Sequence, residues 1–324
     1  MTKAVRIHET GEPDVLKWED TDVPAPGAGE ALIRQTAVGL NYLDIYFRSG
    51  LNPPPALPII LGMEAAGVVE SVGDGVTEVS PGDRVAYNMF LSAYAEQRTM
   101  PAERLVKLPD GISDKVAASM MLKGTTAQYL LCRTYEVKPG DTILFHAAAG
   151  GVGLIACQWA KHLGATVIGT VGSDEKAELA KAHGCDHPIV YTRDNFVEKV
   201  KEITGGKGVS AVYDSVGKDT FMASLDCLKP RGFMVLFGNS SGPVEPFAPG
   251  ILVAKGSLYL TRPSLANYTG TRQELVDTCN DLFKVVESGA VKVEVNQTYD
   301  LKDTAQAHRD LAARKTTGST VLLP

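Results

Sequence analysis

The sequence lacks the features on which disulfide-bonded, membrane-spanning and nucleic-acid-binding proteins depend. Its five cysteines are scattered along 324 residues, and none forms a C-x-x-C pair or lies at ligand spacing from a histidine. No apolar run approaches the roughly 18 residues of a membrane span, and the first residues lead into a strand without a signal-peptide core. The net charge of -6 disfavours a general nucleic-acid binder. We therefore expect a cytoplasmic protein with free thiols, no membrane insertion and no nucleic acid as its main partner.

The most informative segment runs from Thr142 to Gly153 and reads TILFHAAAGGVG. It has the pattern of a short strand, a turn of small residues and a helix, and a second strand over 165–171 completes a βαβ unit. In G-x-G-x-x-G terms, Ala148 takes the first glycine position, and Gly150 and Gly153 take the others. Such a turn lets a pyrophosphate approach the backbone N–H groups at a helix N-terminus. Close helix–strand packing alone is the alternative, but the βαβ context favours dinucleotide binding at Gly150, Gly151, Val152 and Gly153.

The chain changes character near Ser113. Before it, short apolar segments separated by Gly/Pro turns predict a closed or partly closed antiparallel barrel. After it, we predict two helices on either side of Gly124 (114–122 and 125–134), and then alternating strands and helices that form a doubly wound parallel sheet. The tail carries a predicted helix over 272–288 and strands over 291–295 and 320–323, and we expect it to pack back on the first domain. The predicted fold is α/β, with domains at 1–121 and 122–265 and a return segment at 266–324.

The tip of the second predicted strand indicates the cofactor. In NAD-preferring folds an Asp or Glu ends this strand and binds the ribose 2′-hydroxyl. Here the strand ends in Gly172 and Ser173, and Lys176 follows one helical turn later, which favours the 2′-phosphate of NADPH. Asp174 and Glu175 complicate this interpretation, and Lys176 is otherwise a solvated helix charge. Tyr191, after the third strand, lies against the adenine or packs in the core.

Several segments, taken together and in order, resemble the medium-chain dehydrogenase/reductase superfamily, and within it the zinc-free NADPH-dependent quinone oxidoreductases related to ζ-crystallin. The resemblance covers nearly the whole chain and implies a GroES-like catalytic domain beside a Rossmann domain. The segments that carry it are Gly39–Asp44, Leu61–Gly67 (LGMEAAG), Pro81–Val85, Leu122–Thr126 (LKGTT), His146–Gly153, Tyr213–Gly217 and Phe237–Ser240.

The chain departs from the zinc alcohol dehydrogenases at each catalytic ligand. Asn41 and Met63 stand where a Cys and a His bind the metal, and the third ligand position falls at about Leu122. An amide, a thioether and an alkyl group do not make a tetrahedral zinc site. The four closely spaced cysteines of the structural zinc are also absent from 88–100. We therefore predict no metal, with Met63 and Glu64 filling or ordering the vacated position.

The resemblance implies a set of site residues. Asn41 and Tyr46 are matched to the place where substrate meets nicotinamide, and Arg262 to the nicotinamide amide or the substrate, so we name these three as catalytic candidates. Loop stabilisation and simple packing are the alternatives for Asn41 and Tyr46, and Asp44 is expected to cap the helix of Tyr46. We expect His146 to pack locally and the other histidines to lie on the surface. The remaining cofactor-binding candidates are Tyr42, Thr126, Tyr129, Ser215, Phe237, Gly238, Asn239, Ser240 and Arg314.

The implied reaction is hydride transfer from NADPH to a small quinone, whose electrophilic carbonyls need no Lewis acid. Reduction of an activated C=C bond in an enone or enoyl thioester is the nearest alternative, although no basic cluster for coenzyme A phosphates is present. A non-catalytic, crystallin-like role is the alternative from a different class. The resemblance also implies a homodimer formed through the edge strand near 233–260.

Overall fold

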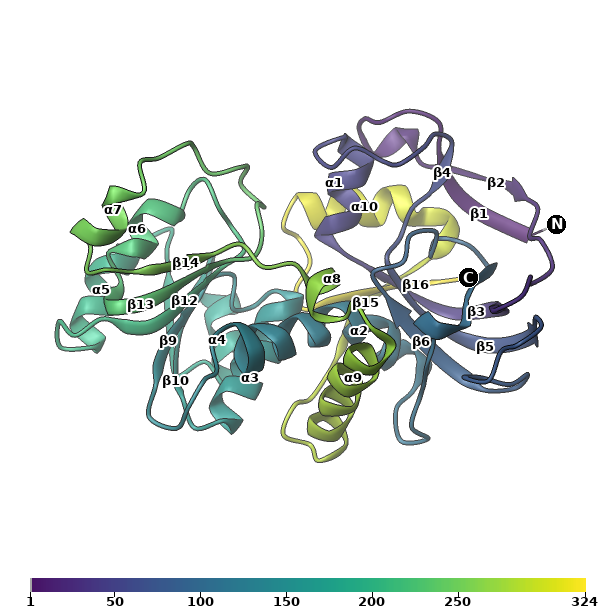
Figure 1. Cartoon of the computed structure of the whole chain (residues 1–324). Helices are drawn as coiled ribbons and strands as arrows, with labels where there is room; N and C mark the ends of the chain where they lie inside the picture. Colours follow the sequence, from purple (N-terminus) through teal and green to yellow (C-terminus); the bar gives the residue numbers. More distant parts are fainter. Residues whose placement is uncertain (1) are drawn as a thin grey trace. The chain divides into compact units, whose positions relative to one another are not determined.

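The computed structural model describes residues 2–324, which form two compact units. Unit 1 comprises Met1–Thr125, Thr269–Glu287 and Val293–Pro324, and unit 2 comprises Thr126–Tyr268 and Ser288–Lys292. Unit 1 is therefore assembled from three stretches of chain, and its last strand returns to pair with one strand of the first stretch. Figure 1 follows this path by colour, with the yellow C-terminal elements placed among the purple N-terminal ones.

Unit 1 contains two sheets. The larger has the strand order β15-β16-β3-β5-β6-β8, with β7 also paired to β3, and only its β15–β16 pair is parallel. The smaller has the order β2-β1-β4. The strands are β1 (Thr2–Ile7), β2 (Lys17–Thr21), β3 (Glu30–Leu40), β4 (Ile59–Ile60), β5 (Glu64–Val72), β6 (Arg84–Asn88), β7 (Gln97–Pro101), β8 (Val106–Lys107), β15 (Val295–Asp300) and β16 (Ser319–Leu323). The helices are α1 (Tyr42–Ser49), α9 (Arg272–Glu287) and α10 (Thr304–Ala312), with short 3-10 turns at Pro13–Val15, Ala102–Arg104 and Leu301–Asp303.

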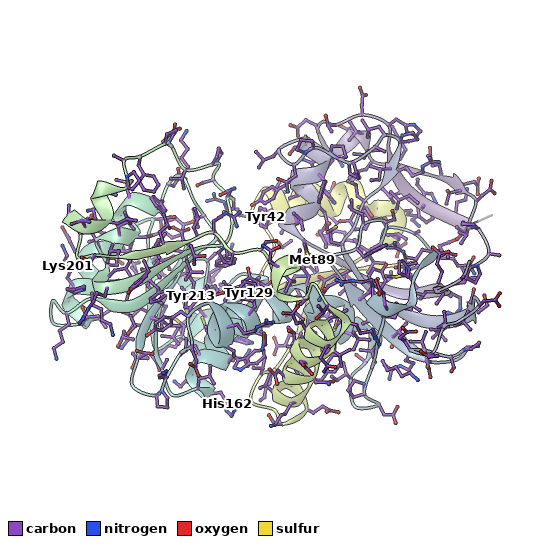
Figure 2. The ribbon with its side chains drawn as sticks, in the orientation of Figure 1. Tyr42, Met89, Tyr129, His162, Lys201 and Tyr213 are labelled. Carbon is purple, nitrogen blue, oxygen red and sulfur yellow. The ribbon has the colours of Figure 1, made fainter. Side chains whose placement is uncertain are left out.

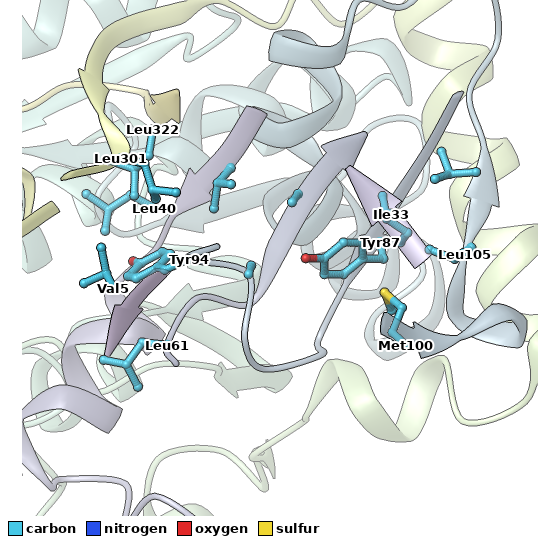
Figure 3. Close-up of a cluster of buried hydrophobic side chains, with 14 of the residues drawn as sticks. Val5, Ile33, Leu40, Leu61, Tyr87, Tyr94, Met100, Leu105, Leu301 and Leu322 are labelled. Atoms are coloured by element: carbon cyan, nitrogen blue, oxygen red, sulfur yellow. The ribbon is translucent and has the colours of Figure 1, made fainter. Parts of the chain in front are cut away.

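Strand β3 lies at the centre of unit 1, and its sequence explains its position. Ala31, Ile33 and Ala37 alternate inward, and the strand then becomes buried on both faces up to Leu40. Its neighbour β5 approaches closely because a Cβ on Gly67 would lie 2.3 Å from the Arg34 carbonyl oxygen. Aliphatic and aromatic side chains from the first and last stretches of unit 1 close the core around this strand (Figure 3).

Unit 2 is built on a parallel sheet with the order β11-β10-β9-β12-β13-β14. Helices cover both faces, with α3 and α4 on one side and α5 and α6 on the other (Figure 1). The strands are β9 (Thr142–Phe145), β10 (Thr166–Val171), β11 (His187–Val190), β12 (Val209–Asp214), β13 (Leu228–Leu236) and β14 (Tyr259–Thr261). The helices are α3 (Gly151–His162), α4 (Asp174–Ala182), α5 (Phe196–Ile203), α6 (Phe221–Leu225), α7 (Gly250–Ala254) and α8 (Leu265–Tyr268). This is the predicted doubly wound sheet, and its strand order reverses beside β9.

The predicted break at Gly124 is wrong, because α2 (Asp114–Tyr129) runs through this residue and a π-helical turn at Leu130–Thr134 follows. Gly124 permits close packing and does not end the helix. A Cβ on Gly124 would lie 2.5 Å from the Leu282 side chain of α9. Glycine here lets α9 approach the helix backbone.

The predicted strand over 291–295 is also wrong, since β15 begins only at Val295. The Gln158 side chain holds the backbone of Lys292 instead. Its amide nitrogen donates to the Lys292 carbonyl oxygen at 3.0 Å, and its amide oxygen accepts from the Lys292 N–H at 2.9 Å. No helix within 2–324 has the length and apolarity to cross a membrane.

Candidate functional site

The glycine turn of unit 2 has the geometry of an anion-binding helix N-terminus. Strand β9 ends at Phe145, and Gly150, with extended backbone, precedes the first turn of α3. A Cβ on Gly153 would lie 2.4 Å from the Ala147 carbonyl oxygen, so glycine alone fits there. The first turn of α3 carries no acidic residue. The turn therefore suits a phosphate, which backbone N–H groups at a helix N-terminus can bind.

Strand β10 is followed by two neutral residues, Gly172 and Ser173, and Lys176 lies in the first turn of α4. Ser173 is the N-cap of α4, and its hydroxyl accepts from the Lys176 N–H at 3.3 Å. A Cβ on Gly172 would lie 3.1 Å from the Tyr191 hydroxyl oxygen, so the two residues are neighbours. The Asp174 carboxylate forms an exposed ion pair with Arg193, at 3.1 Å between Nη2 and Oδ1. Arg193 is a second cation at this edge that sequence reasoning missed.

The loops that follow β12 and β13 lie at the same edge of the sheet and contact one another. The Asp214 carboxylate, fully buried, accepts from the Val216 and Gly217 N–H groups at 2.7 and 3.0 Å. The Ser240 N–H donates to the Ser215 carbonyl oxygen at 3.1 Å. A Cβ on Gly238 would lie 2.6 Å from that same oxygen. Gly238 and Ser240 thus lie against Ser215, as their place after adjacent parallel strands predicts, and the Phe237 N–H donates to the Asp214 carbonyl oxygen.

Aromatic stacking organises the last turn of α2 within unit 2. Tyr129 is buried, and its ring stacks on Tyr268 with centroids 4.6 Å apart (Tyr129 is labelled in Figure 2). Burial raises the pKa of the Tyr129 hydroxyl well above its ordinary value, opposed by the positive charge of Arg262. Arg262 is exposed and donates to the Pro263 carbonyl oxygen at 3.3 Å. Thr126 lies one turn earlier on the same helix.

In unit 1, Asn41 begins α1 and joins a buried polar cluster. Its side-chain amide donates to Glu64 Oε1 at 2.9 Å. The Lys123 ammonium donates to the same oxygen at 2.6 Å, and the Leu122 N–H donates to Glu64 Oε2 at 2.6 Å. Glu64 is fully buried and the Lys123 side chain is only 7% exposed. We call Asn41, Glu64 and Lys123 the amide–carboxylate–ammonium cluster.

A buried ion pair therefore lies directly beside the vacated ligand positions Asn41, Met63 and Leu122. The donor set does not fit zinc, because Asn41, Met63 and Leu122 offer an amide, a thioether and no donor atom. Within residues 2–324 no group of three or more His, Cys, Asp or Glu side chains has metal-binding geometry. The Lys123 ammonium supplies a fixed positive charge to the buried Glu64 carboxylate. Lys123 lies in an otherwise apolar stretch of α2, and this pattern could have indicated a buried ion pair from the sequence.

The other unit 1 candidates lie on α1 and after α10. The Tyr42 hydroxyl donates to the Leu311 carbonyl oxygen at 3.1 Å (Tyr42 is labelled in Figure 2). Tyr46 is half-buried on the same helix as Tyr42. Arg314 is exposed and has a positive φ of 58° just after α10. Asn41, Tyr42, Tyr46 and Arg314 thus belong to unit 1, whereas the remaining candidates belong to unit 2, and the role of each stays a prediction.

The histidine expectation is right for His146 and wrong for His183 and His308. His146 is buried between Thr170 Oγ1 at 2.8 Å and Ser224 Oγ at 2.9 Å, so it bonds locally. His183 is also buried. His308 is fully buried in unit 1, where its ring contacts Tyr94 edge-on. The sequence around a histidine on an amphipathic helix, such as His308 on α10, does not indicate whether its side chain is buried or exposed.

Two buried groups of unit 1 make opposite contributions to the pH dependence of folding. Burial raises the pKa of Asp44 from 3.8 to about 7, and burial beside Arg48 lowers that of His308 from 6.5 to about 3. Between about pH 4 and 6.5 the folded state keeps a proton on Asp44 that the unfolded state loses, so stability falls as pH rises. Over the same range the unfolded state keeps a proton on His308 that the folded state excludes, so stability rises.

The two slopes offset one another in the wild-type chain, and removing His308 exposes the slope of Asp44. We expect H308Q to lose stability relative to wild type by about 1.4 kcal/mol per pH unit as pH rises from about 4.5 to 6.5. Urea unfolding at several pH values, followed by Trp18 fluorescence in a W159F background, measures this for unit 1. Parallel stability curves for H308Q and wild type would show that the two groups do not oppose each other.

Comparison with known proteins identifies the families to which the two units are similar. The alcohol dehydrogenase GroES-like domain family matches residues 27–142, and the zinc-binding dehydrogenase family matches 151–281. A quinone oxidoreductase from Pseudomonas aeruginosa is 53% identical over the full length of both chains. A 2-haloacrylate reductase from a Burkholderia species is 48% identical over all of this chain and 99% of its own. A crystal structure of Escherichia coli quinone oxidoreductase complexed with NADPH has a TM-score of 0.97 and 51% identity, covering 99% of this chain and all of that one.

The fold and these matches define a medium-chain dehydrogenase/reductase, with a GroES-like domain and a Rossmann domain. Within that class, the chain belongs to the zinc-free quinone oxidoreductase family. The predicted family and fold class are confirmed.

Proposed function

We propose that this protein reduces quinones with NADPH by direct hydride transfer, without zinc. The observation that carries the proposal is the amide–carboxylate–ammonium cluster at the vacated metal position, in a chain whose second unit has a nucleotide-binding turn. The quinone oxidoreductases at 51–53% identity and the NADPH-bound E. coli structure support it.

The residues present suit a substrate that needs orientation more than polarisation. A quinone carbonyl is already electrophilic, so a hydrogen bond and alignment are sufficient for hydride acceptance. Glu64 fixes the Asn41 amide through one N–H, and we assign the other to a quinone oxygen or the nicotinamide ribose. Tyr46 would stack on or donate to the quinone, and Arg262 would bind the nicotinamide amide or the substrate. Solvent can protonate the hydroquinone monoanion, so we assign no general acid.

The cofactor would be held along the carboxyl edge of the unit 2 sheet. NADPH supplies the hydride. The α3 N-terminus behind Gly150 and Gly153 suits its pyrophosphate, and Lys176 suits the 2′-phosphate because no carboxylate stands at the β10 tip. The other residues assigned to it are Tyr42, Thr126, Tyr129, Gly151, Val152, Gly172, Ser173, Tyr191, Ser215, Phe237, Gly238, Asn239, Ser240 and Arg314.

Loss of the Lys176 ammonium should change cofactor preference without changing the chemistry. We expect K176M to lower kcat/KM for NADPH about 10- to 50-fold and to leave that for NADH within about 2-fold, because only NADPH carries the 2′-phosphate. Steady-state kinetics with both cofactors measure the effect. K181M, on the last turn of the same helix, is the control. Equal losses for both cofactors would show that Lys176 does not bind this phosphate.

Reduction of an activated C=C bond is the second candidate, and the 2-haloacrylate reductase at 48% identity favours it. Both substrates accept hydride at a carbon conjugated to a carbonyl group. The test compares NADPH oxidation with 1,4-benzoquinone and with 2-chloroacrylate under identical conditions. Faster turnover of benzoquinone supports quinone reduction, whereas turnover of 2-chloroacrylate alone overturns it.

We further propose a cytoplasmic homodimer formed through the β14 edge of unit 2. Tyr259 on β14 is 55% exposed and stacks on Phe233 with centroids 4.7 Å apart, which leaves an apolar strand edge accessible. All five cysteines are free, as in a reducing compartment. Sedimentation as a monomer at micromolar concentration would contradict the dimer.

A further inference from the structure

Beneath α1, four buried side chains of unit 1 form a chain of hydrogen bonds to which the proposed function has so far assigned no role. The Tyr94 hydroxyl lies 2.8 Å from Asp44 Oδ2 and 3.0 Å from His308 Nε2. His308 Nδ1 lies 3.4 Å from Arg48 Nη1. Asp44, Tyr94 and His308 are completely buried, and Arg48 is 4% exposed. Elements from both ends of the chain therefore converge on the first turn of α1.

Only one arrangement of hydrogens satisfies this chain. Arginine donates always, so His308 Nδ1 accepts and its Nε2 carries the proton. The Nε2–H then donates to the Tyr94 oxygen, which leaves the Tyr94 hydroxyl to donate to Asp44. Burial keeps His308 neutral, with a pKa lowered to about 3. The donor and acceptor roles from Arg48 through His308 and Tyr94 to Asp44 are therefore fixed over the working pH range.

Asp44 connects this chain to the candidate site. Its Oδ2 accepts from the Asn41 N–H at 2.8 Å, which closes the N-terminus of α1. Its Oδ1 is buried without a hydrogen-bond partner, so the carboxylate is held through Oδ2 alone. Removal of the Tyr94 hydroxyl would leave the Asn41 N–H as the only group that orients it.

We propose that Tyr94 and His308 are positioning residues for quinone reduction: they hold the Asp44 carboxylate against the Asn41 backbone and thereby fix the Asn41 amide that faces the substrate. This inference rests on the proposed function. The charged and titratable groups around Asp44 are Glu64, Lys123 and Tyr94, with His308 and Arg48 behind them. Asp44 accepts from the Asn41 backbone N–H, and Glu64 accepts from the Asn41 side-chain amide. The two carboxylates therefore position Asn41 together.

The test uses Y94F, with Y87F as its matched control. Both remove one hydroxyl from a fully buried tyrosine of the unit 1 core, but the Tyr87 hydroxyl donates to Gln35 and accepts from Arg98, neither of which lies on α1 or α10. Figure 3 shows Tyr94 beside Val5 and Leu40, and Tyr87 beside Ile33 and Met100. We expect Y94F to lower kcat for benzoquinone about 10-fold, with the Kd for NADPH within 2-fold of wild type. Y87F should change neither.

The pH profile and a conservative rescue separate positioning from general destabilisation. Loss of the Tyr94 hydrogen bond raises the pKa of Asp44, so the acid limb of kcat should move to higher pH in Y94F and stay in place in Y87F. H308A should behave like Y94F, whereas H308Q, which retains a donor near the Nε2 position, should recover most of kcat. Equal loss of kcat in Y94F and Y87F, or an unchanged acid limb in Y94F, would overturn the proposal.

A failure of the proposed function is distinguishable from a failure of the positioning chain. If wild-type protein does not reduce benzoquinone, quinone reduction fails as the function. Amide hydrogen exchange of α1 then still tests the chain. Faster exchange at Asn41 and along α1 in Y94F, with no change in Y87F, supports it, and equal exchange in the two variants contradicts it.

Discussion

Replacing Lys123 by methionine lowers the free energy of unfolding of unit 1 by about 3–5 kcal/mol, the cost typical of leaving one partner of a buried ion pair unpaired. The Glu64 carboxylate is fully buried and would keep only the Asn41 amide and the Leu122 N–H. Urea unfolding followed by Trp18 fluorescence in the W159F background measures this effect, because Trp18 lies in unit 1 and Trp159 in unit 2.

Two further variants show that the loss comes from charge. The double variant E64Q/K123M should regain at least half of the lost stability, because a neutral amide tolerates burial without a cation. K302M removes one partner of the exposed Lys302–Asp300 pair of unit 1 and should change stability by less than about 0.5 kcal/mol. If K123M is as stable as K302M, the ammonium does not compensate the buried carboxylate.

G153A should weaken NADPH binding about 100-fold, equivalent to about 2.7 kcal/mol. A Cβ at this position would lie 2.4 Å from the Ala147 carbonyl oxygen and 2.6 Å from that of Ala148, so the turn must open. Opening displaces the N–H groups at the start of α3 that the pyrophosphate would contact. Isothermal titration calorimetry with NADPH gives the affinity directly.

The control is G250A, the same substitution in the same unit. Gly250 begins α7, and a Cβ there would have no neighbour within 4 Å. G250A should therefore bind NADPH within 2-fold of wild type, and thermal unfolding should show both variants folded. Wild-type NADPH affinity in G153A would show that the pyrophosphate does not depend on this turn.

Local signals explain what could be predicted from the sequence. The β9–turn–α3 unit was identifiable because an apolar strand, small turn residues and a helix follow one another within 142–162. Gly124 misled the prediction because a glycine that permits close packing resembles one that ends a helix. Only the contact with Leu282, far along the chain, distinguishes the two.

The buried polar groups could not be predicted for the same reason. Tyr94 and His308 are 214 positions apart, and neither has a motif around it. Burial of His308 depends on how α10 packs in unit 1, which no spacing rule encodes. By contrast, the loss of zinc ligands was predictable because it depends only on residue type at Asn41, Met63 and Leu122.

Removal of zinc tests whether this protein reduces quinones without a metal. Protein dialysed against EDTA, with zinc content determined by mass spectrometry, is mixed with NADPH and 1,4-benzoquinone, and the absorbance of reduced nicotinamide is followed. We expect rapid NADPH oxidation at a rate unchanged by EDTA, with less than about 0.1 zinc per chain. Activity that disappears on dialysis and returns with added zinc would contradict it.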